Sequence, residues 1–306
     1  MAVRFVVGRA GSGKTFRCLE AVRTRLRETA AEGPRLLLLV PEQASFQVER
    51  ALIETPDIPA YTRCEVLSFQ RLAYRVFAET GADPRRSDQT IGGLGRMMVI
   101  RRLIRRERVG LRLLGSVADK PGLVNQVAGT LDELMREEVD PAKLAEVAEA
   151  REEVDPLGAA KLADVARLYQ AYLDYLIEDR IDPAQYLNLA AQRLDGCSFL
   201  SGAEVWVDGF AGFTRQEFHL LAEVAKRAAK VEITMLVDPA ASAVEATQLP
   251  AISYSRFARA ERTLVRLRTE LQSRGVAIDE PIRLETNPER CRFAAPELLQ
   301  LERELF

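Results

Sequence analysis

Two apolar runs near the start of the chain, residues 3–7 (VRFVV) and 35–40 (RLLLLV), contain almost no polar positions. A strand buried on both faces shows this pattern, and such strands are typical of parallel sheets. Between the runs, the spacing of apolar residues predicts a helix from Thr15 to about Glu28, which would connect the two strands. The opening of the chain therefore indicates a β–α–β unit.

The pattern changes in the middle of the chain. A third strand at 64–67 and a helix over 69–80 continue the α/β pattern, but helical periodicity then dominates from about Gly92 to Leu194. Strand character returns at 203–210 and again at 231–238. This order predicts a parallel sheet that is interrupted by an all-helical insertion.

We therefore expect an α/β protein with helices on both faces of the sheet, ending in an amphipathic helix at 253–274. The expected domains are the first part of the sheet domain, the helical insertion, and the completed sheet domain with its C-terminal helix, at 1–91, 92–198 and 199–306 respectively.

Composition narrows the function classes. The 43 basic and 45 acidic residues give a net charge of −2, which neither requires nor forbids a nucleic acid partner. No run of 18 apolar residues predicts a membrane span, and the first residues lack the features of a signal peptide. We expect a cytoplasmic protein with no membrane partner.

Cysteine and histidine usage argues against metal and triad chemistry. Cys18, Cys64, Cys197 and Cys291 are widely spaced without a CxxC pair, so neither a zinc site nor a disulfide framework is expected. His219 is the one histidine and lies in a predicted amphipathic helix. We expect no catalytic role for it, because imidazole chemistry needs an orienting partner.

Charge is segregated inside the helical stretch. Residues 85–120 carry nine Arg and one Lys against three acids, whereas residues 132–155 carry ten acids against three bases. The two segments could pair with each other as solvated helix faces. Alternatively, the basic segment could lie against phosphates, although its few aromatics argue against base stacking there.

The segment GRAGSGKT after the first strand fits the phosphate-binding pattern G-x-x-x-x-G-K-[ST]. Glycines let successive backbone N–H groups point at one phosphate, and the following helix adds positive potential at its N-terminus. Lys14 would supply a charge to the outer phosphates, and the Thr15 hydroxyl would bind Mg²⁺. The predicted ATP-binding residues of the loop are Gly8, Gly11, Ser12, Gly13, Lys14 and Thr15.

A P-loop ATPase also needs an acid at the end of a neighbouring strand to hold the magnesium shell, and a second acid to orient the attacking water. Asp208, which ends the run EVWVD, is the candidate for the first acid, either directly on the metal with Thr15 or as a simple turn former. The next residue is Gly209, which has no side chain to orient water.

Four segments, GRAGSGKT, LLLLVPEQASFQ, EVLSFQRLAYRVFAETG and VWVDGFAGFTRQEFHLL, occur in the order of motifs I, Ia, Ic and II of superfamily 1 helicases. With its VPEQ and DGF segments, the chain resembles the N-terminal part of the B subunit of the AddAB-type ATP-dependent helicase–nuclease. The resemblance implies a RecA-like sheet domain and a chain that continues well beyond residue 306. It also implies a nuclease domain with an iron–sulfur cluster in that missing part.

The same resemblance implies a function. The family's B subunit is a helicase-like protein without motor activity, which pairs with the A subunit, handles single- and double-stranded DNA and helps to recognise Chi in double-strand break repair. Motif II departs from the DE-x-x-D pattern of active motors, since Gly209 and Gly212 replace the later acids. We therefore expect ATP binding without hydrolysis.

The resemblance also implies DNA contacts on segments after the second, third and fourth strands, where ligands of open α/β sheets bind. Guanidinium and amide groups read base edges, and aromatic rings stack on unpaired bases. Phe69 and Tyr74 could instead pack between sheet and helix. The predicted DNA-binding residues are Gln43, Ser45, Phe69, Arg71, Tyr74 and Phe210.

Two other functions stay open. An active superfamily 1 helicase fragment would differ only in turning ATP over. A P-loop small-molecule kinase would use the arginine-rich insertion as a lid, but would leave the resemblance to motifs Ia and Ic unexplained. DNA binding separates the kinase from the other two, and an ATPase assay with DNA separates those from each other.

Overall fold

The structure is a computed structural model that describes residues 2–29, 31–56, 58, 60–81, 83–86, 88–177, 180–248, 255–285, 293 and 295–305. The chain divides into two compact units, and each is described by itself. The first unit, called the sheet unit here, contains residues 1–80, 190–213 and 217–306. The second, the helical unit, contains residues 81–189 and 214–216.

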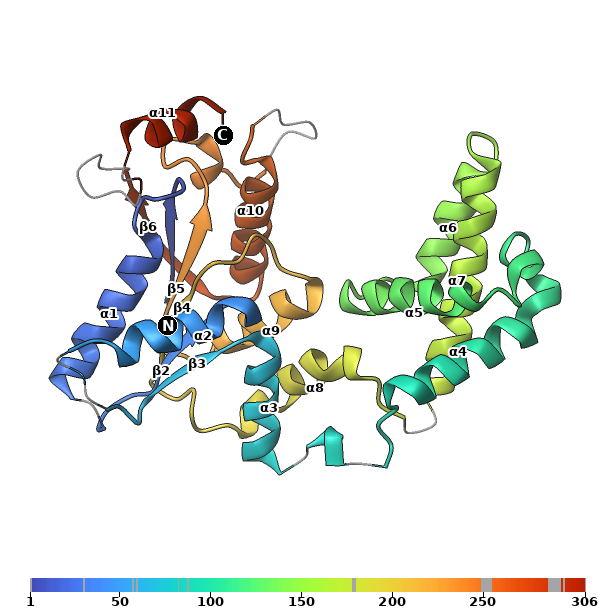
Figure 1. The fold of residues 1–306 in the computed structure, drawn as a ribbon, viewed down its shortest axis with the longest axis horizontal. Coiled ribbons are helices and arrows are strands. Elements are labelled where there is room, and N and C mark those ends of the chain that lie inside the picture. The colour runs from blue at the N-terminus through green and yellow to red at the C-terminus, as the bar shows by residue number, and fades with distance from the viewer. Residues whose placement is uncertain are drawn as a thin grey trace. The chain divides into compact units, whose positions relative to one another are not determined.

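The sheet unit is built on six parallel strands in the order β3-β2-β4-β5-β1-β6 (Figure 1). The strands are β1 Ala2–Gly8, β2 Leu36–Leu39, β3 Cys64–Leu67, β4 Glu204–Val207, β5 Lys230–Leu236 and β6 Ala277–Leu284. The α/β fold with an all-parallel sheet and flanking helices is therefore confirmed, and five of the six strands lie where the apolar runs predict them.

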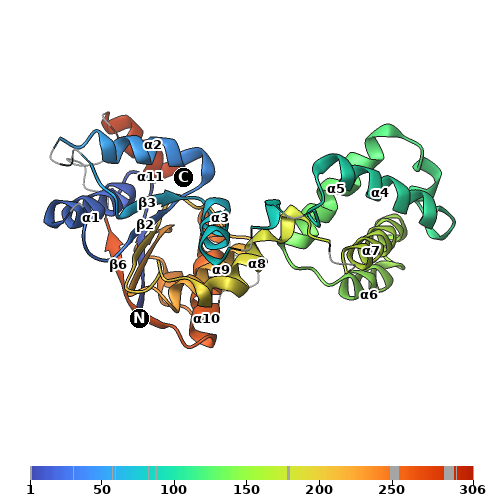
Figure 2. The same cartoon turned by 90° about the horizontal axis from the view of Figure 1, so that it is seen from below.

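Helices cover both faces of this sheet. They are α1 Lys14–Glu28, α2 Glu42–Ile53, α3 Phe69–Thr80, α9 Arg215–Ala225, α10 Ala258–Ser273 and α11 Pro296–Leu305. Apolar residues of α1 and α2 share one buried cluster with β2, β3 and Trp206 of β4. Figure 2 shows α3, α9 and α10 on the opposite face, where the Arg268 guanidinium of α10 lies 6.0 Å from the ring centre of Phe5.

The sixth strand, β6, is missing from the sequence-based prediction. It lies at the sheet edge beside β1, and its residues AIDEPIRL are mostly half-buried or exposed. An edge strand needs no continuous apolar run, and an edge also tolerates a proline such as Pro281. The signal used for the other strands is therefore absent here.

The helical unit contains α4 Gly93–Glu107, α5 Pro121–Arg136, α6 Pro141–Arg151, α7 Pro156–Leu176 and the first half of α8 Tyr186–Arg193. Its core is formed by apolar residues of α4, α5 and α7, including Ile104, Leu131 and Tyr172. The unit spans 81–189, whereas the sequence places the insertion at 92–198; α8 runs across the C-terminal boundary. In the described part of the chain, no helix is long and apolar enough to cross a membrane.

The basic and acidic segments of the helical unit pair in part. The Arg96 guanidinium lies 3.2 Å from the Asp132 carboxylate, and Arg112 lies 2.8 Å from Glu152. Arg108 instead pairs within its own segment, 2.9 Å from Asp119. These contacts support the interpretation that the two segments neutralise each other along part of their length.

Candidate nucleotide site at the carboxyl edge of the sheet

The segment between β1 and α1 has the backbone of a phosphate-binding loop. Gly13 caps α1 with φ of 90°, and Gly11 has φ of 75°, a region that residues with a Cβ rarely enter. At Gly8, a Cβ would lie 2.4 Å from Ser12 Oγ and 2.9 Å from the Leu284 carbonyl oxygen. The glycines of the motif are therefore required by the local geometry of the loop.

Lys14 folds back onto its own loop. Its Nζ donates hydrogen bonds to the carbonyl oxygens of Gly8 at 2.7 Å and Arg9 at 2.8 Å. Burial lowers the pKa of Lys14 to about 8, although the carboxylates of Asp208 and Glu302 act in the opposite direction. A desolvated ammonium of this kind would gain from an anionic ligand, which could replace the two carbonyl acceptors.

Asp208, directly after β4, meets the loop. The Thr15 hydroxyl donates to Asp208 Oδ2 at 2.7 Å, and the Thr234 hydroxyl of β5 donates to Asp208 Oδ1 at 2.6 Å. The sequence analysis predicted that Thr15 and Asp208 act together, and the two side chains are in contact. It did not predict the contact with Thr234, which lies on the neighbouring strand. Asp208 is therefore held in place by two hydroxyls.

This corner has the oxygen donors that Mg²⁺ prefers. Mg²⁺ takes one or two protein ligands and completes its shell with phosphate oxygens and water, so Thr15 and Asp208 fit it. The described residues contain no cluster of three or more His, Cys, Asp or Glu side chains that could hold a metal ion. A Mg²⁺ ion held by Thr15 and Asp208 would supply positive charge beside the phosphate loop.

A cavity of about 1060 Å³ adjoins the loop, lined by residues 10–17 together with Leu284 and Glu285 after β6. The C-terminal segment also reaches this region. Arg9 Nε lies 3.0 Å from the buried carboxylate of Glu302 on α11, and the Phe293 ring packs so closely on Gly11 that a Cβ there would lie 2.8 Å from it. The sequence analysis did not predict that these residues lie near the loop, because the sequence contains no apolar strand pattern at β6.

The backbone at the position after Asp208 disfavours residues with a Cβ. Gly209 has φ of 82°, and a Cβ on it would lie at an ordinary 3.4 Å from Pro41 Cδ. The obstacle to a glutamate here is therefore backbone strain rather than lack of space. Gly212 is not among the described glycines with a positive φ.

The parallel sheet brings the predicted DNA-binding segments to the same edge as the loop, since all follow the carboxyl ends of strands. Gln43 and Arg71 are exposed, and the Arg71 guanidinium lies 2.9 Å from Glu49. Tyr74 is half-buried, and its hydroxyl accepts a hydrogen bond from Gln70 at 2.6 Å. Phe210 is also half-buried. These four side chains are at least partly accessible to a ligand.

Phe69 and Ser45 lie in the interior instead. Phe69 is 4% exposed and packs edge-on against Phe210, with 5.2 Å between ring centres. The buried Ser45 hydroxyl donates to the Glu42 carbonyl oxygen at 2.6 Å within the first turn of α2. We expected both side chains to contact DNA directly, but in this conformation both have interior roles instead. Phe69 packs against the ring of Phe210.

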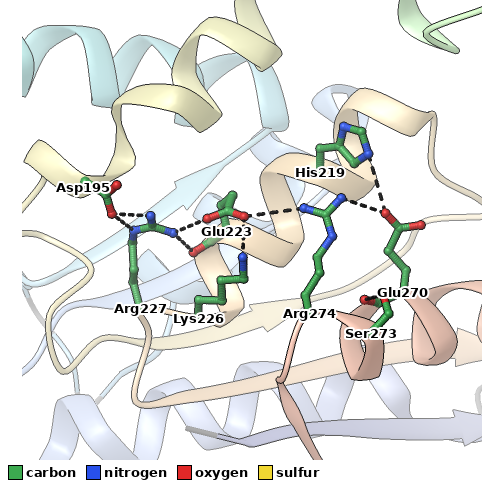
Figure 3. Close-up of polar contacts among 8 residues, drawn as sticks. All are labelled: Asp195, His219, Glu223, Lys226, Arg227, Glu270, Ser273 and Arg274. Atoms are coloured by element: carbon green, nitrogen blue, oxygen red, sulfur yellow. Dashed lines mark hydrogen bonds and ion pairs between the residues drawn. The ribbon is translucent and has the colours of Figure 1, made fainter.

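His219 and Cys64 lie in structural surroundings. His219 on α9 lies 3.5 Å from Glu270 in an ion-pair network that joins α9 to α10 (Figure 3). Glu223 accepts from Lys226 at 2.8 Å and Arg227 at 2.7 Å in the same network. Burial raises the pKa of Cys64 to about 12, which keeps its thiol protonated. Cys291 lies outside the described residues.

Comparisons with known proteins agree on one family. Residues 5–302 match the family described as "ADDB, N-terminal". The chain is 43% identical over its whole length to the B subunit of an ATP-dependent helicase/deoxyribonuclease of Pelotomaculum thermopropionicum, of which it covers 26%. It is 42% identical to the protein of that name from Desulforudis audaxviator, with 100% of the chain and 25% of the relative covered.

A third relative of the same name, from Heliobacterium modesticaldum, is 40% identical over 99% of the chain and is covered to 24%. The chain thus spans about a quarter of the length of these curated relatives. The family match runs through residues 5–302, so it includes the phosphate loop, the helical unit and β6 alike. The chain belongs to the AddB family and corresponds to the N-terminal part of its members.

Proposed function

We propose that this chain is the nucleotide-binding, motor-inactive, DNA-handling part of the B subunit of a two-subunit helicase–deoxyribonuclease. The observation that carries the proposal is the combination of two neighbouring features. The phosphate loop and its Thr15–Asp208 corner are intact, whereas Gly209 beside them has neither a carboxylate nor a backbone suited to one.

Each group in the site has a role in binding rather than in hydrolysis. The loop amides and Lys14 would hold the β- and γ-phosphates, and Thr15 and Asp208 would hold Mg²⁺ against them. Hydrolysis further requires a group that orients water for in-line attack. The residue after Asp208 cannot supply one, so bound ATP would act as a structural or regulatory ligand.

Direct measurement of binding and turnover tests the proposal. The protein should bind Mg-ATP without hydrolysing it above background, with or without DNA. Lys14→Ala should remove binding and leave the fold intact, because the Lys14 ammonium contacts its own loop and not the apolar core. Lys120→Ala, an exposed lysine of the helical unit, should bind like the unsubstituted protein.

Two results would contradict this function. DNA-stimulated turnover of several per second, which is in the range of ordinary enzymes, would favour the active helicase. Equal ATP affinity of Lys14→Ala and the unsubstituted protein would mean that the loop is not a nucleotide site. Membership of the AddB family leaves the small-molecule kinase without a supporting observation.

We further propose that Gln43, Arg71 and Phe210 contact DNA bases at the carboxyl edge of the sheet and contribute to recognition of Chi. Their support is their accessibility on one edge, together with the name of the relatives, which describes an enzyme that acts on DNA. The same name designates a B subunit, so we expect an A subunit to be its partner. A DNA-processing role would place the protein in the cytoplasm.

A further inference from the structure

The order of the strands indicates how a nucleotide would be oriented in the cavity. β1, which carries the phosphate loop, lies between β5 and β6, and β4 with Asp208 lies beyond β5. The magnesium corner is therefore on the β5 side of the loop, whereas Leu284 and Glu285 line the cavity from the β6 side. A triphosphate whose metal-bound end lies at Asp208 would direct its nucleoside toward β6.

Phe16 belongs to the lining of this same cavity. It follows Thr15 in the first turn of α1, lines the cavity and is 66% exposed. Covering an exposed aromatic ring with a stacked base removes apolar surface from water, which is favourable. Its neighbour Arg17 turns toward the sheet, where a guanidinium nitrogen lies 3.7 Å from buried Glu232. Among the described lining residues, Phe16 presents an exposed aromatic ring that a base could stack on.

The cavity is large enough for this use. Its volume of about 1060 Å³ is slightly above the roughly 300–1000 Å³ typical of small-molecule sites. This volume exceeds what the phosphates alone would need, and Phe16 and Leu284 both belong to its lining.

We propose that Phe16 is the stacking platform for the base of the bound nucleoside triphosphate, so that the site favours purine over pyrimidine triphosphates. This inference rests on the proposed nucleotide binding and adds the residue that recognises the base. Stacking depends on overlap between π-faces, and the two fused rings of a purine cover more of Phe16 than a pyrimidine does.

The test compares ligands that have and lack a base. Calorimetric titrations of the protein with ATP, CTP and tripolyphosphate, each with Mg²⁺, give three affinities for every variant. Phe16→Ala should weaken ATP binding by about tenfold or more, which is the range for losing one stacked base. It should leave tripolyphosphate affinity within about twofold and reduce the preference for ATP over CTP. Phe16→Trp, which keeps an aromatic ring, should retain both the affinity for ATP and the preference for ATP over CTP.

Phe46→Ala is the matched control. Phe46 is a similarly exposed ring, at 71%, but it lies on α2 and outside the cavity lining, so its removal should change none of the three affinities. If ATP and tripolyphosphate bind and Phe16→Ala leaves their ratio unchanged, the inference is wrong and the proposed function stands. If neither ligand binds the unsubstituted protein, both the proposed function and the inference are wrong.

Discussion

At the scale of single residues, burial makes the charged form of Lys14 less stable in the free protein, and an anionic ligand would stabilise it. Burial lowers its pKa to about 8, from an ordinary 10.5, so at about pH 9 most of the free protein carries it uncharged. A bound triphosphate favours the charged ammonium and raises that pKa again. Binding and protonation of Lys14 are therefore linked in this pH range.

We predict that Mg-ATP binding takes up close to one proton at about pH 9 and almost none at about pH 6.5, where Lys14 is already charged. Calorimetry in two buffers that differ in ionisation enthalpy measures this uptake. In Lys14→Arg, whose guanidinium stays charged throughout, any residual binding should show no uptake. Equal uptake at both pH values, or uptake that persists in Lys14→Arg, would contradict the role given to Lys14.

Gly209 shows how backbone conformation restricts a side chain. We predict that Gly209→Ala lowers the free energy of unfolding by about 1–2 kcal/mol, because its φ of 82° is strained for a residue with a Cβ. Gly212→Ala, later in the same segment and without a positive φ, should cost less than the first substitution. Denaturant unfolding of the two variants measures the difference.

Gly209→Glu should also fail to create a motor, because hydrolysis requires several groups that act together and are not restored one at a time. An ATPase assay with and without DNA checks this expectation. Robust DNA-stimulated turnover in Gly209→Glu would show that one carboxylate was all that the site lacked.

For the stability prediction, equal free energies of unfolding of Gly209→Ala and Gly212→Ala would show that strain at position 209 is negligible.

At the scale of elements, a buried carboxylate joins two segments of the helical unit. Asp164 of α7 is 1% exposed and accepts hydrogen bonds from the backbone N–H groups of Arg112 at 2.7 Å, Leu113 at 2.8 Å and Leu114 at 2.7 Å. It thereby fixes the turn that follows α4 against α7. Periodicity cannot reveal such a contact, because its partners are about 50 residues apart in the chain.

We predict that Asp164→Asn lowers the free energy of unfolding by about 2–3 kcal/mol, since an amide offers one acceptor oxygen where three buried donors need two. Asp155→Asn is the isosteric control: Asp155 caps α7 by accepting from the Gly158 N–H at 2.9 Å, and asparagine caps equally well. Urea unfolding compares the two. A loss no larger for Asp164→Asn than for Asp155→Asn would contradict this account.

At the scale of the whole molecule, an all-parallel sheet collects segments from distant parts of the sequence at one edge. The phosphate loop, the start of α2 with Gln43, the start of α3 with Arg71, and the turn with Phe210 all follow carboxyl ends of strands. The proposed nucleotide binding and DNA contacts would therefore share one rigid support. Because the chain spans about a quarter of its relatives' length, we expect recognition of DNA to depend on the complete enzyme.

We predict that alanine at Gln43, Arg71 or Phe210 weakens the response to Chi in a complete two-subunit enzyme while DNA unwinding continues. Each lost base contact should cost about 1–3 kcal/mol. The measurement is nuclease attenuation on DNA with and without Chi. An unchanged ratio in well-folded Arg71→Ala and Gln43→Ala enzymes would mean that these residues are structural.

Substitutions in the basic segment of the helical unit provide the control for that experiment. If the exposed Arg101 and Arg102 lie on phosphates, alanine at either should weaken binding to all sequences alike and reduce the salt slope by about one. Their effect on the Chi ratio should be small. A selective loss of the Chi response in these variants would instead move sequence recognition to the helical unit.

The sequence by itself determined the features that are local or continuous. Buried parallel strands must be apolar on both faces, so five strands and their order along the chain could be predicted, and the phosphate loop could be recognised from glycine and lysine spacing alone. The loss of carboxylates at Gly209 and Gly212 is equally visible in the letters. None of these inferences depends on which distant residue lies beside them.

Only the tertiary structure decided the rest, because the contacts involved join segments far apart in the chain. It added the edge strand β6, which has no apolar signature, and with it Leu284 and Glu285 in the lining of the cavity. It separated buried Phe69 and Ser45 from accessible Gln43 and Arg71, although all four follow strand ends. The lowered pKa of Lys14 likewise arises from burial, a property of the folded environment that residue type and spacing do not specify.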